Sequence, residues 1–183
     1  MVKKDALIVV DIQNDFMVGG SLAVPHTDNN FLSRVNDKIN YAYDHSYLII
    51  GTQDWHPVRH VSFDSWPVHC VQKTYGADFP DGLSSQYFNT IFRKGYDRGI
   101  ESYSVVVDSN GNYSGIVDYL RSNNISHINV CGLAFDYCVG YTALHLASNG
   151  FDVVIESGLT LGINRESIDS MKSLLMNSGV HIF

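Results

Sequence analysis

The chain has 183 residues, of which 45% are hydrophobic and 17% are charged, as in an ordinary soluble globular protein. This length suits a single core, so we expect one domain over residues 1–183. The formal net charge is −7, and no run of Lys or Arg interrupts it, which argues against a nucleic-acid partner. No apolar stretch reaches the about 20 residues that a membrane span requires, so we expect no membrane partner.

The N-terminal segment carries two lysines before an apolar run, which superficially resembles a signal peptide. The run covers only residues 6–10 and ends at Asp11, so it predicts a buried strand instead. The three cysteines, Cys70, Cys131 and Cys138, lack the spacing of a disulfide framework. They predict free thiols in a reducing compartment, and we expect a cytoplasmic protein.

Apolar patterns along the chain predict alternating strands and helices. Residues 29–45 have apolar positions at helical spacing, with Asp28 or Asn29 as the N-cap. Residues 57–86 contain three of the four prolines and no clean period, which predicts a long functional loop. We expect strands at 6–10, 47–52, 89–93, 127–133, 151–155 and 180–183, and helices at 29–45, 113–123, 137–149 and 166–177.

This alternation indicates right-handed crossovers and parallel strands covered on both faces. We therefore expect an α/β fold, a three-layer αβα sandwich around a mostly parallel, Rossmann-like sheet of six strands. Sites in such sheets lie outside the carboxyl ends of the strands. Four side chains follow or end predicted strands and should converge there: Asp11, Asp54, Lys94 and Cys138.

Cys138 lies where the apolar strand breaks at Gly132 and a helical pattern resumes. A helix N-terminus lowers a thiol pKa and stabilises an oxyanion. Asp11 could serve as the base for this thiol, and the Lys94 ammonium would stabilise both charged groups. The alternatives are a buried structural cysteine and an ordinary ion pair between Asp11 and Lys94.

A second cluster combines Asp54 and His56 with His60 and His69 from the predicted loop. In extended backbone, Asp54 and His56 point the same way. A mixed Asp and His set favours Zn²⁺, Mn²⁺ or Fe²⁺ over Ca²⁺ or Mg²⁺. Any one of these histidines could instead be a solvated loop residue. Cys70 is left out of this set, because a thiolate at the metal would compete with the proposed chemistry.

Aromatic residues flank both clusters: Phe16, Trp66, Tyr103 and Tyr137. They could belong to the core. Near a nucleophile and a metal they instead suggest a narrow slot for a flat ring.

With these residues assembled, the sequence resembles the nicotinamidases of the isochorismatase-like superfamily along almost the whole chain. The motifs that carry the resemblance are VDIQNDF at 10–16, QDWHPVRHVSF at 53–63, WPVHC at 66–70, GADFPDGL at 76–83, RKGYD at 93–97 and GLAFDYCV at 132–139. Two departures bear on substrate range. Phe135 stands where many members have Thr, and the segment between Phe63 and Trp66 is short.

The resemblance implies a role for each matching residue. Cys138 matches the nucleophile, Asp11 the general base and Lys94 the third member of the triad. The metal ligands are implied to be Asp54, His56 and His69, with His60 as a further ligand in some members. A cis peptide between Leu133 and Ala134 is implied, with the N–H groups of Ala134 and Cys138 forming the oxyanion hole. The substrate positions are implied to be Phe16, Trp66, Tyr103, Leu133 and Tyr137.

The resemblance also implies the activity, which is hydrolysis of nicotinamide to nicotinate and ammonia in NAD salvage. It implies a divalent metal cofactor, with Zn²⁺ the first choice and Mn²⁺ or Fe²⁺ open. Three other functions stay open: a related amidohydrolase for another carboxamide or N-carbamoyl compound, an inactive ligand-binding domain, and a metal-dependent hydratase. A homo-oligomer also stays open.

Overall fold

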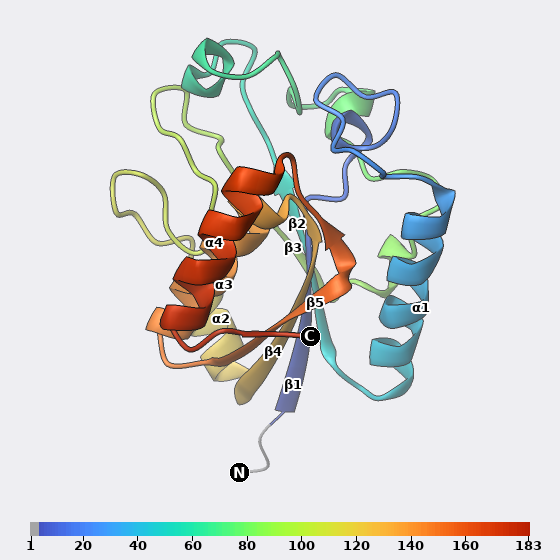
Figure 1. Cartoon of the computed structure of the whole chain (residues 1–183), viewed down its shortest axis with the longest axis vertical. Coiled ribbons are helices and arrows are strands. Elements are labelled where there is room, and N and C mark those ends of the chain that lie inside the picture. Colours follow the sequence, from blue (N-terminus) through green and yellow to red (C-terminus); the bar gives the residue numbers. More distant parts are fainter. Residues whose placement is uncertain (1–3) are drawn as a thin grey trace.

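The computed structural model describes residues 4–183. Six parallel strands form one sheet in the order β3-β2-β1-β4-β5-β6 (Figure 1). The strands are β1 (Lys4–Val10), β2 (Leu48–Asp54), β3 (Thr90–Lys94), β4 (Ile125–Leu133), β5 (Asp152–Leu161) and β6 (His181–Ile182). The predicted α/β class and six-stranded sheet are confirmed, and every strand pair is parallel.

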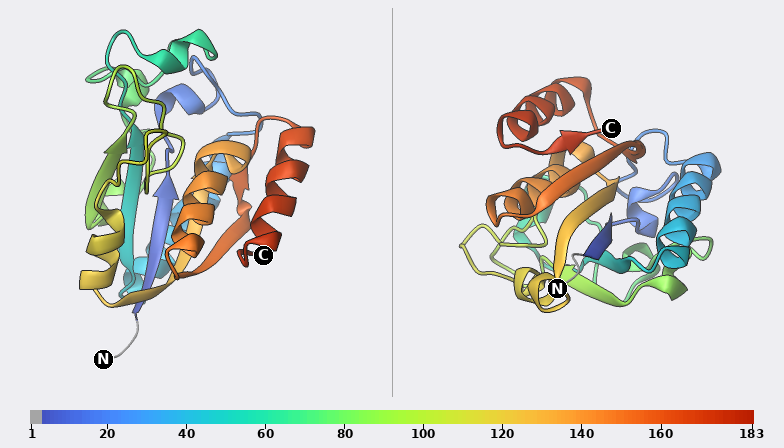
Figure 2. Two further views of the ribbon diagram at one scale, coloured as in Figure 1. Left: turned by 90° about the vertical axis from the view of Figure 1, so that its left-hand side faces the viewer. Right: turned by 90° about the horizontal axis from the view of Figure 1, so that it is seen from below.

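Helices cover both faces of the sheet, which makes three layers (Figures 1 and 2). One face packs against α1 (Asn29–Asp44), and the other packs against α2 (Ile116–Ser122), α3 (Gly140–Ser148) and α4 (Arg165–Asn177). Successive side chains of a strand point to opposite faces. Leu7 and Val9 therefore join the core under α1, whereas Ile8 and Val10 join the core under the other three helices.

Helix α1 follows the predicted pattern closely. The Asp28 carboxylate accepts a hydrogen bond from the Phe31 N–H at 2.8 Å, which caps a free donor of the first turn. Phe31, Val35 and Ile39 are fully buried on its inner face. The apolar spacing seen in the sequence is therefore the surface that packs against the sheet.

Several elements differ from their predicted bounds, and α2 and β5 are two examples. Helix α2 begins at Ile116 rather than at residue 113, because Gly115 takes a positive φ of 87° just before it. Strand β5 continues to Leu161, six residues beyond the predicted end. It does so by pairing with β4 across a register shift between Val130 and Gly132, a long-range contact that local patterns do not reveal.

The order of the strands indicates at which end of the sheet a ligand would bind. From β1 the chain moves outward to β2 and β3, and it then crosses to β4 and moves outward the other way. The carboxyl ends of β1 and β4 therefore flank the topological switch point, where ligands bind in such sheets. Residues 57–78 lie at this end, whereas residues 79–86 lead past α1 to the start of β3 (Figure 1). Apart from an isolated bridge at Val71, residues 57–86 are loop with short 3₁₀ turns, as predicted.

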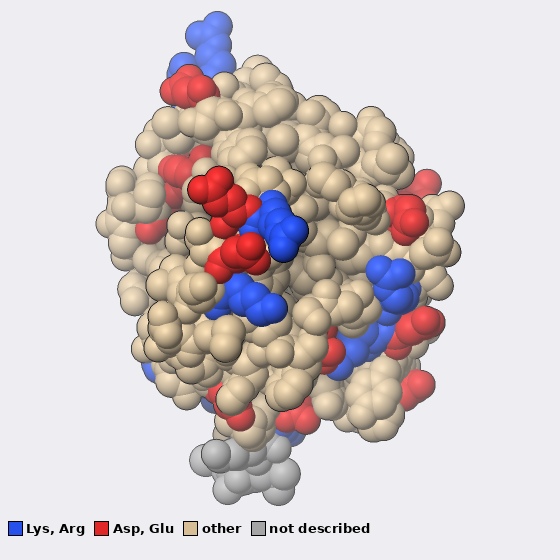
Figure 3. All heavy atoms as spheres, in the orientation of Figure 1, with Lys and Arg blue, Asp and Glu red and all other residues tan. Residues whose placement is uncertain are grey.

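Charged side chains of both signs are interspersed on the face that Figure 3 shows. Within residues 4–183, no helix combines the length and the apolar character needed to cross a membrane.

We predict that Gly132→Ala strongly destabilises the fold. Gly132 has a φ of +115°, and a Cβ there would lie 2.1 Å from the Val10 carbonyl oxygen on the neighbouring strand. We expect a loss of about 3 kcal/mol in the free energy of unfolding, measured by urea denaturation. Gly158→Ala is the matched control, because a Cβ at Gly158 meets no atom within 4 Å. Its stability should change by no more than about 0.5 kcal/mol, and equal midpoints for both variants would contradict the prediction.

Candidate active site

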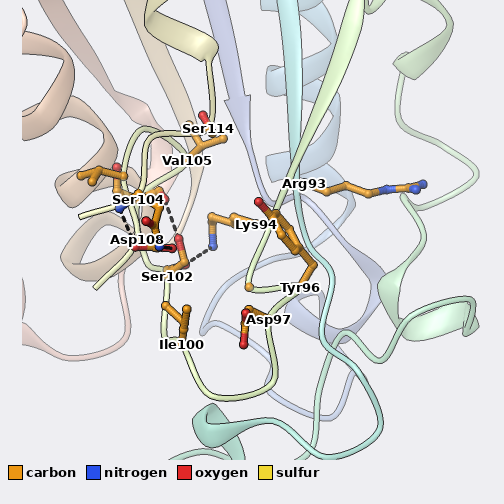
Figure 4. A pocket seen from close by; sticks show the side chains of 13 residues that line it. Arg93, Lys94, Tyr96, Asp97, Ile100, Ser102, Ser104, Val105, Asp108 and Ser114 are labelled. Atoms are coloured by element: carbon orange, nitrogen blue, oxygen red, sulfur yellow. Dashed lines mark hydrogen bonds between the residues drawn. The ribbon is translucent and has the colours of Figure 1, made fainter. Parts of the chain in front are cut away.

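The centre of the site is the ammonium group of Lys94, which ends β3 and is 3% exposed. Its Nζ lies 3.0 Å from Asp11 Oδ2 and donates to Asp54 Oδ1. It also donates to the Ser102 carbonyl oxygen at 3.1 Å, as Figure 4 shows, and to Cys138 Sγ at 3.3 Å. One cation therefore holds together side chains that follow or end β1, β2 and β4.

Asp11 is the first residue after β1 and is fully buried. Its Oδ1 accepts a hydrogen bond from Thr52 Oγ1 at 2.5 Å. Its Oδ2 lies 3.0 Å from Lys94 Nζ, and within residues 4–183 no other donor bonds to it. A carboxylate oxygen of Asp11 lies within 4.8 Å of Cys138 Sγ. Asp11 therefore offers a free acceptor beside the thiol, as a general base must.

Burial sets the proton affinities of this cluster. It raises the pKa of Asp11, against the attraction of Lys94. Burial alone would lower the pKa of Lys94, but the charges of Asp11 and Asp54 outweigh it and hold that pKa well above its usual value. Lys94 thus stays charged, and the raised pKa makes Asp11 a stronger base than an ordinary carboxylate.

Burial also raises the pKa of the Cys138 thiol well above its usual value, although Lys94 opposes the shift and Asp11 and Asp54 reinforce it. This direction is opposite to the one expected from a helix N-terminus alone. Desolvation in a site with two carboxylates is the reason. Cys138 is therefore held as a thiol, and a base must remove its proton before the sulfur can act as a nucleophile.

Cys138 lies on a π-helical turn, Phe135–Val139, which runs directly into α3. The predicted helix therefore begins two residues early and with a wider first turn, a form that is frequent at functional sites. The peptide bond between Leu133 and Ala134 is cis, as the resemblance implies. Cys138 is 7% exposed, and it lines the cavity described below.

Asp54, His56 and His69 form a second cluster, with one ligand atom from each within 4.8 Å of the others. The Nδ1 atom of His56 faces the Gly95 carbonyl oxygen at 2.9 Å, and that of His69 faces the Pro67 carbonyl oxygen at 2.7 Å. Backbone carbonyls in this position orient metal-binding imidazoles and leave Nε2 for the metal. The Nε2 of His56 is buried and has no hydrogen-bond partner in the part of the chain that the structure describes. Burial also lowers the pKa of His56, which favours the neutral, ligating ring. The cluster therefore fits a divalent metal.

His60 is not brought into this cluster. Its Nε2 faces the Ile100 carbonyl oxygen at 3.1 Å, and its Nδ1 accepts a hydrogen bond from the Ser62 N–H at 3.1 Å. Its ring stacks on that of His56, with the centroids 4.1 Å apart. Both nitrogens of His60 are thus engaged by the backbone, and the ring supports His56 from the side.

Gln13 is a site residue that the sequence reasoning missed. Its Nε2 donates to the carbonyl oxygens of Asp54 and Ala77, both at 2.8 Å, and its Oε1 accepts from the Asp54 N–H at 2.8 Å. Gln13 therefore fixes the backbone of Asp54 from both sides. The only signal in the sequence was its place within the VDIQNDF motif.

A cavity of about 440 Å³ opens beside both clusters. Phe16, Trp66, Tyr103 and Tyr137 line it together with Cys138, as the sequence predicted. Trp66 Nε1 donates to the Tyr103 hydroxyl oxygen at 3.1 Å, which ties two loops together over the cavity. Leu133 is buried at the end of β4 and does not line the cavity. Wall residues that were not anticipated are Leu22, Val24, Ser62, Glu101 and Ile163.

A second cavity, of about 360 Å³, lies on another side of Lys94 under residues 95–114 (Figure 4). Ser104 and Asp108 on its wall already bond backbone N–H groups of their own segment. Cys138 does not line it. Of these two cavities, Cys138 therefore lines the aromatic one.

The comparisons with known proteins agree with this geometry. Residues 5–182 match the isochorismatase domain family. The chain is 33% identical over 190 residues to the nicotinamidase of Escherichia coli (strain K12), covering 93% of this chain and 89% of that protein. It is 37% identical over 170 residues to the nicotinamidase/pyrazinamidase of Mycobacterium tuberculosis, covering 88% and 89%.

Two solved structures are similar over nearly the full chain. PnC1 from L. infantum, in complex with nicotinate, has a TM-score of 0.91 and 36% identity, covering 99% of this chain and 92% of that one. The pyrazinamidase of Pyrococcus horikoshii, in complex with zinc, has a TM-score of 0.85 and 34% identity, covering 98% of each chain. The chain therefore belongs to the isochorismatase-like superfamily and, within it, to the nicotinamidases and pyrazinamidases.

Proposed function

We propose that this protein hydrolyses nicotinamide to nicotinate and ammonia through a thioester on Cys138. The observation that carries the proposal is the contact of one buried ammonium, that of Lys94, with the thiol and with two carboxylates. A thiol beside a free carboxylate oxygen suits acyl transfer. The complex of PnC1 from L. infantum with nicotinate supports the choice of ligand.

The walls of the cavity support a flat heteroaromatic substrate. Phe16, Trp66 and Tyr137 supply aromatic faces and edges beside Cys138. Asp54, His56 and His69 would hold the divalent metal, and Zn²⁺ is the metal that best suits this donor set, with Mn²⁺ or Fe²⁺ as alternatives. When bound, the metal would supply a Lewis acid for the pyridine nitrogen of the substrate.

The first half of the reaction forms the thioester. Asp11 accepts the thiol proton of Cys138, and the sulfur attacks the carboxamide carbon. The backbone N–H groups of Ala134 and Cys138 would hold the oxyanion, and such donors contribute about 10²- to 10³-fold in rate each. Asp11 then returns the proton to the leaving nitrogen, which departs as ammonia. Lys94 keeps its charge throughout and stabilises the ionised carboxylate and thiolate in turn.

The second half of the reaction consumes water. Asp11 accepts a proton from a water molecule, whose oxygen attacks the thioester carbon. The carbon–sulfur bond breaks, and the thiolate of Cys138 recovers a proton from Asp11. The acid product loses its remaining O–H proton to solvent and is released as nicotinate. A related amidohydrolase for another small carboxamide would use the same triad, so the substrate must be tested directly.

We predict that the purified protein releases ammonia from nicotinamide, and that a chelator abolishes this activity. Adding back Zn²⁺, Mn²⁺ or Fe²⁺ should restore it, because the Asp54, His56 and His69 cluster has the donors that these ions prefer. Ammonia is measured in a coupled assay, with Mg²⁺ as the control ion, which should not restore activity. A folded protein that releases no ammonia with any of these metals would exclude nicotinamide and favour another carboxamide or an N-carbamoyl compound.

We predict that Cys138→Ala lowers kcat by at least about 10⁴-fold, because no thioester can form. Binding of nicotinate, followed by isothermal titration, should persist. Cys131→Ala is the matched control, since Cys131 is a buried thiol whose cluster lies on the opposite face of the sheet; it should keep its kcat. Steady-state turnover by Cys138→Ala would overturn the nucleophile assignment and favour a metal-activated water.

We predict that His56→Ala loses its bound metal and raises KM by at least about ten-fold, because one of the three ligands is gone. Elemental analysis of the purified variant gives the metal content independently of activity. His45→Ala is the control, since His45 is exposed at the end of α1. Unchanged metal content in His56→Ala would contradict the ligand assignment.

A further inference from the structure

Asp136 is a buried acid that the proposed reaction does not use. It lies two residues before Cys138 on the same π-helical turn and is 3% exposed. Its carboxylate accepts hydrogen bonds from the N–H of Ile163 at 3.0 and 3.1 Å and from that of Asn164 at 3.3 Å. The hydroxyl of Ser167 donates a further bond at 2.5 Å. Ile163 and Asn164 belong to the segment that leads from β5 into α4, and Ser167 lies in the first turn of α4.

Ile163 connects these hydrogen bonds to the proposed substrate cavity. Its backbone N–H is held by Asp136, and the residue lines the cavity that also contains Cys138. The single carboxylate of Asp136 therefore joins the turn that carries the nucleophile to a wall of the substrate cavity. Three residues donate hydrogen bonds to this one side chain, so the turn and the wall are held together at several points.

Close packing leaves the link little freedom to rearrange. A Cβ at Gly162 would lie 2.5 Å from Ile168 Cγ1 and 3.1 Å from Asp136 Oδ1. A Cβ at Gly140, just after the π-helical turn, would lie 2.7 Å from the Phe135 carbonyl oxygen. Gly162 therefore lies too close to Ile168, and Gly140 too close to the Phe135 carbonyl, for either glycine to be replaced by a residue with a side chain.

We propose that Asp136 is a positioning residue, which holds Cys138 and Ile163 in register across the substrate cavity. The inference rests on the proposed function for its effect on turnover. Without the carboxylate, the N–H groups of Ile163 and Asn164 lose their acceptor, and both the turn and the wall shift. A displacement of about 1 Å in a reacting group costs roughly 10²-fold in rate. Displacing Cys138 lowers kcat, and displacing Ile163 raises KM.

The variants form a graded series. Asp136→Ala removes the hydrogen bonds to Ile163, Asn164 and Ser167. Asp136→Asn keeps the size and one acceptor oxygen, so its amide cannot serve all the donors at once. Ser167→Ala removes only the hydroxyl bond. Asp152→Asn is the matched control, since Asp152 is an exposed acid paired with His127 at the start of β5.

Turnover is measured well below the unfolding temperature of each variant, so that loss of stability alone changes neither constant. We expect Asp136→Ala to lower kcat at least ten-fold and to raise KM several-fold. The expected change in kcat is smaller than the roughly 10²-fold loss for a displacement of about 1 Å, because the shift of Cys138 is expected to be smaller. Asp136→Asn should be intermediate, Ser167→Ala smaller, and Asp152→Asn unchanged. Wild-type kcat and KM in folded Asp136→Ala would overturn the proposal and leave Asp136 a purely stabilising role. If that variant does not fold, wild-type constants in both Asp136→Asn and Ser167→Ala overturn it.

Alkylation by iodoacetamide separates this inference from the proposed function, because it needs no turnover. The modification of Cys138 is followed by mass spectrometry of its peptide, and we expect it to be several-fold slower in Asp136→Ala than in the wild type. If the wild type releases no ammonia from nicotinamide but alkylation still depends on Asp136, the proposed function fails and the positioning role stands. Alkylation of folded Asp136→Ala at the wild-type rate or faster would overturn the positioning role.

Discussion

The buried ammonium of Lys94 is the interaction on which the site depends. It contacts Asp11, Asp54 and Cys138, which follow or end three other strands. Burying these charges singly would cost several kcal/mol each, and close pairing with hydrogen bonds offsets that cost. Asp54 also links two functions: Oδ1 accepts from Lys94, whereas Oδ2 lies 3.7 Å from His56 Nε2. Asp54 therefore connects the proposed metal cluster to Lys94 of the proposed triad.

Hydrogen bonds to the backbone fix the orientations of the proposed metal ligands. The rings of His56 and His69 are oriented by the carbonyl oxygens of Gly95 and Pro67, and Gln13 fixes both backbone polar groups of Asp54. Backbone partners at strand ends hold a side chain in one orientation before any ligand arrives. Such preorganisation is what makes electrostatic stabilisation effective in a site that excludes water.

The same burial controls the chemistry of Cys138. Desolvation raises the pKa of the thiol and that of Asp11. In the proposed reaction the proton is therefore on sulfur in the resting site and moves to the carboxylate during attack. Lys94 remains charged because its two carboxylate partners outweigh its own desolvation. A thiol that ionises only beside its base is also less open to oxidation than a free thiolate.

The sequence by itself determined the strand and helix order and the meeting of Asp11, Asp54, Lys94 and Cys138 at one rim. Apolar periodicity is local, and parallel topology makes strand ends converge. Only the tertiary structure decided that β5 extends to Leu161, that the nitrogens of His60 face the backbone, and that Asp136 reaches Ile163. These features join residues 27 or more positions apart, and the direction of the pKa shift of Cys138 depends on burial. Contacts and desolvation of this kind arise only when distant segments pack together, so no local pattern encodes them.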